Sequence, residues 1–381
     1  MRKVAVITGT RADYGILYPV LKAIDSSQNL KLQLIVCGMH LCPDFGMTIK
    51  EIEKDGFEIS DKFETVFSSD TGSSMAKTVG LSIMYAAQSF ERLKPDIVLV
   101  LGDRGEMLAA AIAACYMNIP VAHIHGGEVS GTVDESIRHA ITKLSHIHFP
   151  ATEDSRNRII KMGEKEENVF VVGAPGLDVI KSTKYISREE FLNKFGLKDD
   201  KIILMTQHPV TTEIDDVDFQ IRETLNAIVS IGKQTVITYP NSDSGGRMII
   251  RRIEEYRQKY SFIKVYKNLS QYDYLNLLNN ADVMVGNSSS GIIEAASFKL
   301  PVVNIGTRQN GRLRGINVMD AAYSRKEIIN AINKSLYDDN YIKSLDKCIN
   351  PYGDGNASGR IVKILNDIKI DRNLIQKKIT Y

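Results

Sequence analysis

The chain has 381 residues, of which 43% are hydrophobic and 25% are charged, and its formal net charge is +2 at pH 7. This length exceeds one ordinary hydrophobic core and suits two domains, while the composition is that of a soluble globular protein. The small net charge gives no electrostatic argument for binding nucleic acid or a membrane surface.

Targeting and membrane signals are weak in this sequence. The first apolar segment is followed closely by Arg11 and Asp13, which is unlike a secretory signal peptide. The apolar stretch over residues 109–122 contains a proline and is too short for a membrane span. The four cysteines form no CxxC pair, so we expect reduced thiols and a cytoplasmic location.

Short apolar segments alternate with amphipathic segments along the first half of the chain. The segments with strand character are Lys3–Thr8, Leu32–Cys37, Ile97–Leu101, Pro120–His123, His148–Pro150 and Val169–Val172. The segments with helical periodicity include Tyr14–Ser26, Ser74–Leu93 and Glu106–Met117. Alternation of this kind predicts parallel sheets with helical crossovers, and therefore α/β architecture.

The second half repeats the pattern. Its predicted strands are Ile202–Thr206, Thr235–Thr238, Phe262–Val265, Val283–Gly286 and Val302–Ile305. Its predicted helices include Phe219–Ile231, Gly246–Tyr260, Tyr272–Asn279 and Ile292–Phe298. Two sheets of about six strands suit the length better than one sheet of twelve. We expect two Rossmann-like, doubly wound domains at 1–175 and 176–365, followed by a charged tail or helix at 366–381, with the active site in the cleft between the domains.

Two turns in the first half carry polar groups at the ends of predicted strands. Gly9 to Gly15 joins the first strand to the first helix and contains Arg11, which suits a phosphate near a helix N-terminus. It is not a GxGxxG motif, which argues against a nicotinamide dehydrogenase. Asp103 and Arg104 follow the strand that ends at Leu101; an aspartate there is either a helix cap or a functional carboxylate.

The densest polar segment runs from His123 to His139. It holds three histidines, three carboxylates and three glycines in 17 residues, directly after an apolar strand. On a helix, Arg138 and His139 share one face with Glu135. A capped helix start with surface histidines is the structural alternative, but this density favours a functional site. The candidate groups are His125, Glu128 and Asp134.

The second half adds a cluster that suits a nucleotide diphosphate. His208 precedes a proline in an extended loop, where a core position is not expected, so we predict a functional role and include it among the catalytic candidates. Ser288, Ser289 and Ser290 lie between a strand and a helix, where hydroxyls and free amides form a phosphate cradle; a helix cap would use only one serine. Glu294 could accept both hydroxyls of a ribose, and Arg308 adds a cation at the next strand end. The sequence shows no spacing typical of metal ligands.

The order of these motifs resembles the hydrolysing UDP-N-acetylglucosamine 2-epimerases, from about residue 3 to residue 365. The motifs are Gly-Thr-Arg11-Ala-Asp-Tyr, Gly-Asp103-Arg104, His-Ile-His125-Gly-Gly-Glu128, Asp134-Glu-Ser-Ile-Arg138-His139, Gly-Asn-Ser288-Ser289-Ser-Gly and Gly-Thr-Arg308-Gln. The resemblance implies the GT-B layout of two Rossmann-like domains. It also implies that a UDP-sugar loses UDP across C1–C2 to give a 2-acetamidoglycal, which takes up water to release free N-acetylmannosamine for sialic or related nonulosonic acids.

The resemblance implies roles for particular residues. Asp103 and Asp134 match catalytic acid/base positions, and Glu128 would take part in the same acid/base catalysis. His125 stands where relatives often have glutamate. The positions that match UDP contacts are Arg11, His208, Asn241, Ser288, Ser289, Glu294 and Arg308; Arg104 and Ser290 are further candidates.

Other consequences concern cofactors, assembly and alternatives. The implied reaction needs no metal and no redox cofactor, and the family suggests a homodimer or tetramer. The sugar is either UDP-N-acetylglucosamine or a 2,4-diacetamido-trideoxy analogue. A GT-B glycosyltransferase, a non-hydrolysing epimerase and a non-catalytic nucleotide-sugar sensor remain alternatives.

Overall fold

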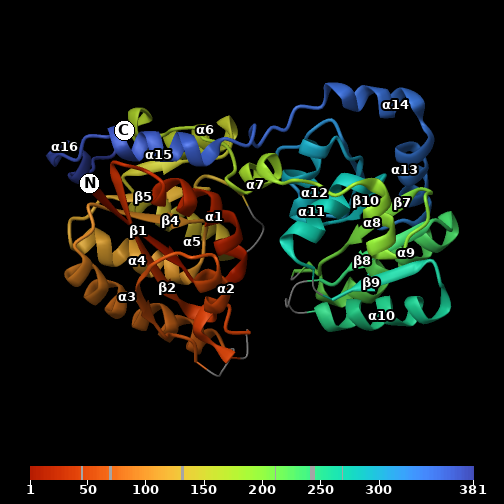
Figure 1. Cartoon of the computed structure of the whole chain (residues 1–381), viewed down its shortest axis with the longest axis horizontal. Helices are drawn as coiled ribbons and strands as arrows, with labels where there is room; N and C mark the ends of the chain where they lie inside the picture. The colour runs from red at the N-terminus through yellow and green to blue at the C-terminus, as the bar shows by residue number, and fades with distance from the viewer. Residues whose placement is uncertain (44–45, 68–70, 130–132, 211, 241–244, 268) are drawn as a thin grey trace. The chain divides into compact units, whose positions relative to one another are not determined.

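The computed structural model describes residues 1–43, 46–67, 71–129, 133–210, 212–240, 245–267 and 269–381. The chain divides into two compact units. The first comprises Met1–Lys181 and Tyr352–Tyr381, and the second comprises Ser182–Pro351 (Figure 1). Each unit consists of a sheet with helices packed on it (Figure 1).

The first unit contains a six-stranded parallel sheet in the order β3-β2-β1-β4-β5-β6. Its strands are β1 Arg2–Thr8, β2 Leu30–Cys37, β3 Ile59–Phe63, β4 Ile97–Leu101, β5 Val121–Ile124 and β6 Ile147–Phe149. Its helices are α1 Arg11–Asp25, α2 Ile49–Lys54, α3 Gly72–Leu93, α4 Gly105–Tyr116, α5 Val133–Leu144, α6 Glu153–Lys161, α7 Gly176–Ser182, α15 Ala357–Asp367 and α16 Arg372–Ile375, with 3₁₀ turns η1 Gly38–Leu41 and η3 Glu166–Asn168.

The second unit repeats this topology in the order β12-β11-β10-β7-β8-β9, again all parallel. Its strands are β7 Ile202–Thr206, β8 Gln234–Thr238, β9 Ile263–Tyr266, β10 Val283–Gly286, β11 Val302–Ile305 and β12 Val318–Ala321. Its helices are α8 Arg188–Phe195, α9 Val217–Ile231, α10 Gly246–Lys259, α11 Gln271–Asn280, α12 Ser289–Ile293, α13 Arg325–Tyr337 and α14 Asp339–Ser344, with 3₁₀ turns η4 Ile214–Asp216, η5 Ala295–Phe298 and η6 Leu345–Lys347. Two doubly wound sheets of six strands confirm the predicted fold class.

Helices cover both faces of each sheet because the strands are apolar on both sides. In β1, Val4 and Val6 belong to one core cluster, whereas Ala5 and Ile7 belong to another on the opposite face. Side chains alternate between the two faces of a strand, so a continuous apolar run requires helical cover on each side. The strand order reverses between β1 and β4 and between β7 and β10, and in such sheets ligands bind outside the carboxyl ends at this point.

The predicted domain boundaries need correction at the C-terminal end. Residues 352–365 were expected in the second domain, but they belong to the first unit. Ile361 and Leu365 of α15 are fully buried in the core of the first sheet, and the Ala174 amide donates to the Tyr352 carbonyl at 2.7 Å. Figure 1 shows α15 beside the N-terminal elements. An apolar stripe identifies a packed helix but does not say which sheet it covers.

Three strand predictions also differ from the structure. Val169–Val172 contributes only an isolated bridge between His148 and Val169. The strands β3 and β12 were not predicted, and both lie at sheet edges. The sequence of β3, Ile-Ser-Asp-Lys-Phe, is mostly polar, and that of β12, Val-Met-Asp-Ala, is short and contains an aspartate. Neither is the uninterrupted apolar run that marked the central strands. Among the described residues, no helix is long and apolar enough to cross a membrane.

Candidate active site

The turn after β4 places Asp103 at the carboxyl end of a central strand. Gly102 has φ of 73°, a left-handed conformation that glycine adopts without strain, and its amide donates to the Ile124 carbonyl at 2.9 Å. The Asp103 side chain is 24% exposed and forms an ion pair with the guanidinium of Arg138 from α5. The turn therefore holds this carboxylate against a buried cation at the switch point of the sheet.

The loop after β5 carries His125 and Glu128. His125 has φ of 61°, which is uncommon for a residue with a side chain. Gly127 also has positive φ, and a Cβ there would lie 2.3 Å from the Ser155 carbonyl oxygen, so only glycine fits. The Glu128 carbonyl accepts a hydrogen bond from Arg138 at 3.1 Å. The Gly-Gly pair thus lets the loop pass close to its neighbours.

Arg138 brings the acidic groups of three segments together. It contacts Asp103 and the backbone of Glu128, and Asp134 lies one turn earlier on the same helix. Burial raises the pKa of Asp103; the Arg138 cation opposes this shift, and the charges of Asp134 and Glu128 add to it. An elevated carboxylate pKa beside further carboxylates is typical of acid/base sites. The structure therefore brings the three predicted carboxylates, Asp103, Glu128 and Asp134, to the surroundings of Arg138.

The two predicted arginines of this unit have other described contacts. Arg11 is exposed at the start of α1, and its guanidinium lies 3.2 Å from Glu51 of α2. The Nε atom of Arg104 lies 3.4 Å from the Glu106 carboxylate.

A buried acidic group lies beside this region and was not predicted. Asp13 accepts hydrogen bonds from the Thr10 amide at 3.0 Å, the Gly9 amide at 3.2 Å and the Thr8 hydroxyl. Burial raises its pKa to about 6, and the bond from Thr8 opposes this shift. Thr10 and Asp13 form the capping box of α1, and the Thr-x-x-Asp spacing was the available signal. This carboxylate shapes the turn that carries Arg11.

In the second unit, Asn287 organises the ends of β7 and β10. Its side chain accepts from the His208 amide at 2.7 Å and donates to the His208 carbonyl at 2.9 Å. Its carbonyl accepts from Gln309 at 2.8 Å and from Arg308 at 3.2 Å. Asn287 is fully buried, and its hydrogen bonds fix the positions of His208 and Arg308. Asn287 was not among the site residues predicted from the sequence.

The hydroxyls of Ser288 and Ser290 form hydrogen bonds within the protein, whereas Ser289 is partly exposed. Ser288 is the N-cap of α12, where its hydroxyl accepts from the Ser290 amide at 3.3 Å. The Ser290 hydroxyl donates to Glu294, whose pKa is raised by burial. Tyr274 of α11, which was not predicted as a site residue, lies beside Ser288 and Ser290, and burial raises the pKa of its hydroxyl. Ser290 and Glu294 are therefore bonded to each other. Ser289 is partly exposed at the first helical position.

The remaining predicted contact, Asn241, lies outside the described residues. No group of three or more His, Cys, Asp or Glu side chains within the described ranges is arranged to hold a metal ion.

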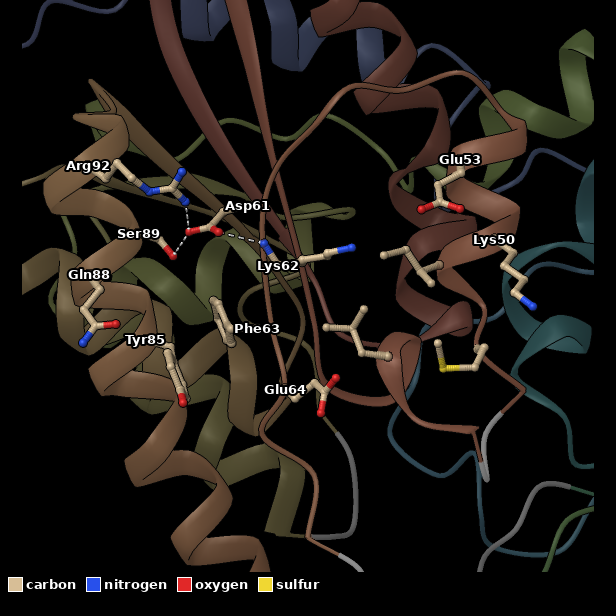
Figure 2. Close-up of a pocket in the computed structure, with 13 residues that line it drawn as sticks. Lys50, Glu53, Asp61, Lys62, Phe63, Glu64, Tyr85, Gln88, Ser89 and Arg92 are labelled. Carbon is tan, nitrogen blue, oxygen red and sulfur yellow. Dashed lines mark hydrogen bonds and ion pairs between the residues drawn. The ribbon is translucent and has the colours of Figure 1, made fainter.

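A hollow of about 720 Å³ lies at the β3 edge of the first sheet, lined by residues of α2, β3 and α3. Figure 2 shows it between α2 and α3, with Phe63 stacked on Tyr85. Asp61 accepts from the Ser89 hydroxyl at 2.6 Å and pairs with Arg92. None of the predicted site residues lines this hollow. Its volume alone is thus a poor guide to the chemistry of the protein.

The comparisons with known proteins identify the family. The UDP-N-acetylglucosamine 2-epimerase family matches residues 22–366. The chain belongs to this family. It is 45% identical to the hydrolysing UDP-N,N'-diacetylbacillosamine 2-epimerase of Legionella pneumophila over 100% of both chains. It is 37% identical to the UDP-N-acetylglucosamine 2-epimerase of Neisseria meningitidis over 88% of each.

A solved structure supports the fold of this family member. The crystal structure of UDP-GlcNAc 2-epimerase from Neisseria meningitidis, bound to UDP-GlcNAc, covers 95% of this chain and 99% of its own with a TM-score of 0.80. The sequence identity in that superposition is 22%, so the likeness concerns the fold. Family membership confirms the resemblance inferred from the motifs.

Proposed function

We propose that this protein is a hydrolysing 2-epimerase that converts a UDP-activated 2-acetamido sugar to UDP and the free sugar with inverted C2. The observation that carries the proposal is the cluster of Asp103, Glu128 and Asp134 around Arg138, at the carboxyl ends of β4 and β5. Abstraction of a C2 proton needs a carboxylate in such a position, and reprotonation needs a second group.

The substrate we propose first is UDP-N,N'-diacetylbacillosamine, the 2,4-diacetamido-trideoxy sugar. The relatives at 45% and 38% identity are both named for this sugar, and the relative at 37% is named for UDP-N-acetylglucosamine. The two sugars differ at C4 and C6, so the comparison of their turnover decides between them. The free product would supply nonulosonic acid synthesis.

The first half of the reaction is an elimination. One carboxylate of the cluster takes the C2 proton, the C1–O bond breaks, and UDP leaves with that electron pair, so that C1 and C2 become doubly bonded. Stabilisation of the charge that develops on the diphosphate is commonly the largest catalytic contribution. We propose that Arg11, Arg308, Ser288 and Ser289 supply it.

The second half is the addition of water to the 2-acetamidoglycal. A base removes one proton from water as its oxygen bonds to C1, and an acid delivers a proton to C2 on the opposite face. Asp103 and Asp134 are our candidates for the pair because they come from different segments. We propose that His125 and Glu128 assist the proton transfers, since each follows β5 beside that pair.

The remaining candidates would bind the nucleotide. Glu294 is partly buried and could accept hydroxyls of the ribose in place of its bond from Ser290. We propose that His208, Arg104 and Asn241 contact the UDP-sugar, of which the first is held by Asn287.

Isotope labelling tests this mechanism. Each UDP-sugar is incubated with the protein and no acceptor, in D₂O or in H₂¹⁸O, and the products are analysed by mass spectrometry. We expect free mannose-configured sugar with one deuterium at C2, and UDP without ¹⁸O, because the bond from C1 to oxygen is the one that breaks.

Other outcomes would separate the alternatives. A product that keeps UDP would indicate a non-hydrolysing epimerase, and turnover only with an acceptor would indicate a glycosyltransferase. UDP binding without any turnover would indicate a sensor. A product that retains its original C2 hydrogen would exclude the elimination.

We also propose that the enzyme works in the cytoplasm as a homo-oligomer, a dimer or tetramer. All four cysteines are free thiols, which suits a reducing compartment. On α3, the side chains of Met75 and Met84 are 64% and 63% exposed, and Tyr116 at the end of α4 is 87% exposed. Large apolar side chains that are exposed in one chain are candidates for burial in an interface between copies. Light scattering coupled to size-exclusion chromatography tests the assembly.

A further inference from the structure

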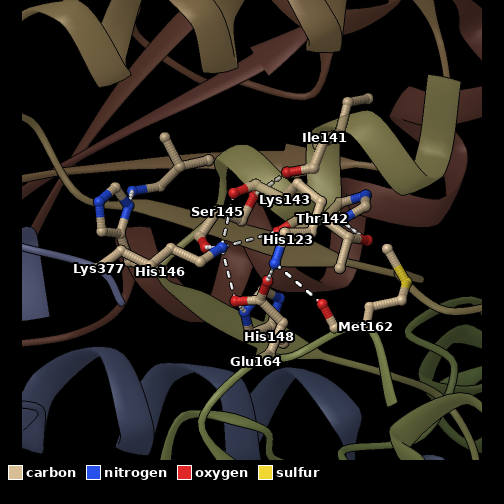
Figure 3. A network of polar contacts seen from close by, with 11 residues as sticks. His123, Ile141, Thr142, Lys143, Ser145, His146, His148, Met162, Glu164 and Lys377 are labelled. Carbon is tan, nitrogen blue, oxygen red and sulfur yellow. Dashed lines mark hydrogen bonds and ion pairs between the residues drawn. The ribbon is translucent and has the colours of Figure 1, made fainter. Parts of the chain in front are cut away.

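His123 is a buried histidine that the proposed reaction does not use. It lies on β5 and has no exposed surface. Its Nε2 atom lies 2.7 Å from the Gly102 carbonyl oxygen. Its Nδ1 atom lies 3.2 Å from the Thr142 hydroxyl (Figure 3). The imidazole therefore bridges the turn that carries Asp103 and the helix that carries Arg138.

The hydrogen-bond partners of the His123 imidazole define its tautomer. A carbonyl oxygen only accepts, so Nε2 carries the proton and donates to Gly102, while Nδ1 accepts from the Thr142 hydroxyl. Burial lowers the pKa of His123 to about 3, and its bond to Gly102 opposes this shift. The ring is thus neutral in the working range of the enzyme and does not exchange protons with the substrate.

The bond to His123 completes the anchoring of Gly102 on β5. The Gly102 amide donates to the Ile124 carbonyl, so both peptide groups of this residue are held by the neighbouring strand. Asp103 follows directly in the chain. On the other side, Thr142 lies one helical turn after Arg138, which pairs with the Asp103 carboxylate. The turn and α5 are thus joined twice, once through the ion pair and once through the buried imidazole.

The loop that carries His125 and Glu128 packs on the same imidazole. A Cβ at Gly126 would lie 2.9 Å from His123 Nδ1 and 3.0 Å from the Thr142 hydroxyl. We propose that His123 is a positioning residue that sets Asp103 relative to α5 and to this loop. The proposal rests on the proposed function, because it assumes that these segments hold the acid/base groups.

The test compares two variants at His123. His123→Leu removes both hydrogen bonds, and we expect kcat to fall on the order of 10²-fold because a misplaced catalytic group loses about that much. The KM for the UDP-sugar and the Kd for UDP should stay within roughly threefold, since the lost effect is on the chemical step. His123→Gln keeps an amide that can donate to Gly102, so we expect it to recover most of the lost kcat.

A matched control separates positioning from general stability. His148 on β6 is also buried, but its Nε2 atom contacts Glu164 at 3.2 Å instead of the Asp103 turn. His148→Leu should lower Tm and leave the kcat of the folded fraction near the wild-type value. Thr142→Val removes only the Nδ1 partner, and it serves as the second test if His123→Leu does not fold; a partial loss of kcat is then expected.

Two results would overturn the proposal. One is a folded His123→Leu variant with kcat within threefold of the wild type. The other is a loss of kcat that is equal in His123→Leu and His148→Leu, which would reflect stability alone. The wild type is measured first with both UDP-sugars; if it shows no turnover, the proposed function fails and the positioning role fails with it.

Discussion

In the proposed reaction, the Asp103 carboxylate is the side chain on which the chemistry most depends. Its partly buried position beside Arg138 suits proton transfer, and Asp103→Asn keeps the shape while removing the ionisable group. We expect kcat to fall at least ~10²-fold, the usual scale for a lost acid/base group. The Kd for UDP, measured by calorimetry, should change little because an amide replaces only the proton-transfer group.

Asp96 offers a matched control for this variant. Asp96 directly precedes the first residue of β4, at the opposite end of the strand from Asp103. Its carboxylate accepts a hydrogen bond from the Lys3 amide at 2.7 Å. Asp96→Asn should retain turnover. A folded Asp103→Asn enzyme with near-normal kcat would reject the acid/base role.

Substitutions of Ser288 and Ser289 test the proposed diphosphate site in the second unit. Loss of hydrogen bonds to a charged group costs roughly 1–3 kcal/mol, so Ser288→Ala with Ser289→Ala should weaken UDP binding about 5- to 150-fold. Ser288 also caps α12, so Ser289→Ala alone separates binding from the stability of the helix. Ser335→Ala, on α13, is the control for loss of a serine hydroxyl that bonds only to its own helix. Unchanged UDP affinity in the double variant would mean that the serine hydroxyls do not bind the diphosphate.

Side chains that directly follow predicted strands could be identified as candidates from the sequence. Side chains that hold those candidates in place through contacts distant in sequence could not. Asp103 and His125 come directly after apolar runs, which is a local signal. Arg138 could be placed on the face of Glu135 by helical spacing, but its contact with Asp103 depends on how β4 and α5 pack. Asn287 bonds to His208 across 79 positions of sequence, and no local pattern predicts such a pair.

At the scale of elements, the C-terminal segment stabilises the helix that carries Asp134 and Arg138. The Lys377 ammonium donates to the Lys143 carbonyl at 2.7 Å, the Ser145 carbonyl at 2.6 Å and the Glu164 carboxylate at 2.6 Å (Figure 3). The last carbonyls of a helix lack partners within the helix, and a cation there also interacts well with the helix dipole. This lysine thus closes the end of α5.

We expect Lys377→Met to lower the free energy of unfolding by about 2–3 kcal/mol, since it removes several hydrogen bonds to a charged donor. Chemical denaturation measures this loss. Lys378→Met is the control, because the neighbouring side chain is exposed and should change stability little. Equal stability of the two variants would contradict the role of Lys377.

The central strands were predictable and the sheet edges were not. Strands such as β4 and β10 are apolar throughout, because both faces of a parallel sheet are covered. The edge strand β3 carries Asp61 and Lys62, which discourage pairing with another chain and also hide the strand pattern. The position of α15 depends on which of two similar sheets it covers, and that choice is not local.

At the scale of the whole molecule, the same strand order appears twice, and each copy presents different chemistry. The reversal between β1 and β4 presents carboxylates and a buried cation, whereas that between β7 and β10 presents hydroxyls, Asn287 and Arg308. Fold alone therefore does not specify function; the groups at each switch point do.

The buried histidines make the stability of the molecule depend on pH. Burial lowers the pKa of His123 to about 3, and those of His40 and His146 to about 4. These groups are neutral when folded and take up protons on unfolding, so acid favours the unfolded chain below their ordinary pKa of 6.5. Burial raises the pKa of Asp13 to about 6, which has the opposite sign: its contribution grows as pH falls from 6 towards 4.

Between pH 7 and pH 5, the loss of stability from the three histidines exceeds the gain from Asp13. At pH 5 each of these histidines costs on the order of 2 kcal/mol, whereas the opposing contribution of Asp13 is on the order of 1 kcal/mol. We therefore expect the free energy of unfolding, measured by denaturant titration, to fall as the pH is lowered from 7 to 5. His146 accepts from the Val121 amide at 3.1 Å through Nδ1, and an asparagine oxygen can accept the same bond without titrating. His146→Asn should reduce the pH slope by about one proton; a flat profile in the wild type would show that the histidines are not neutral in the fold.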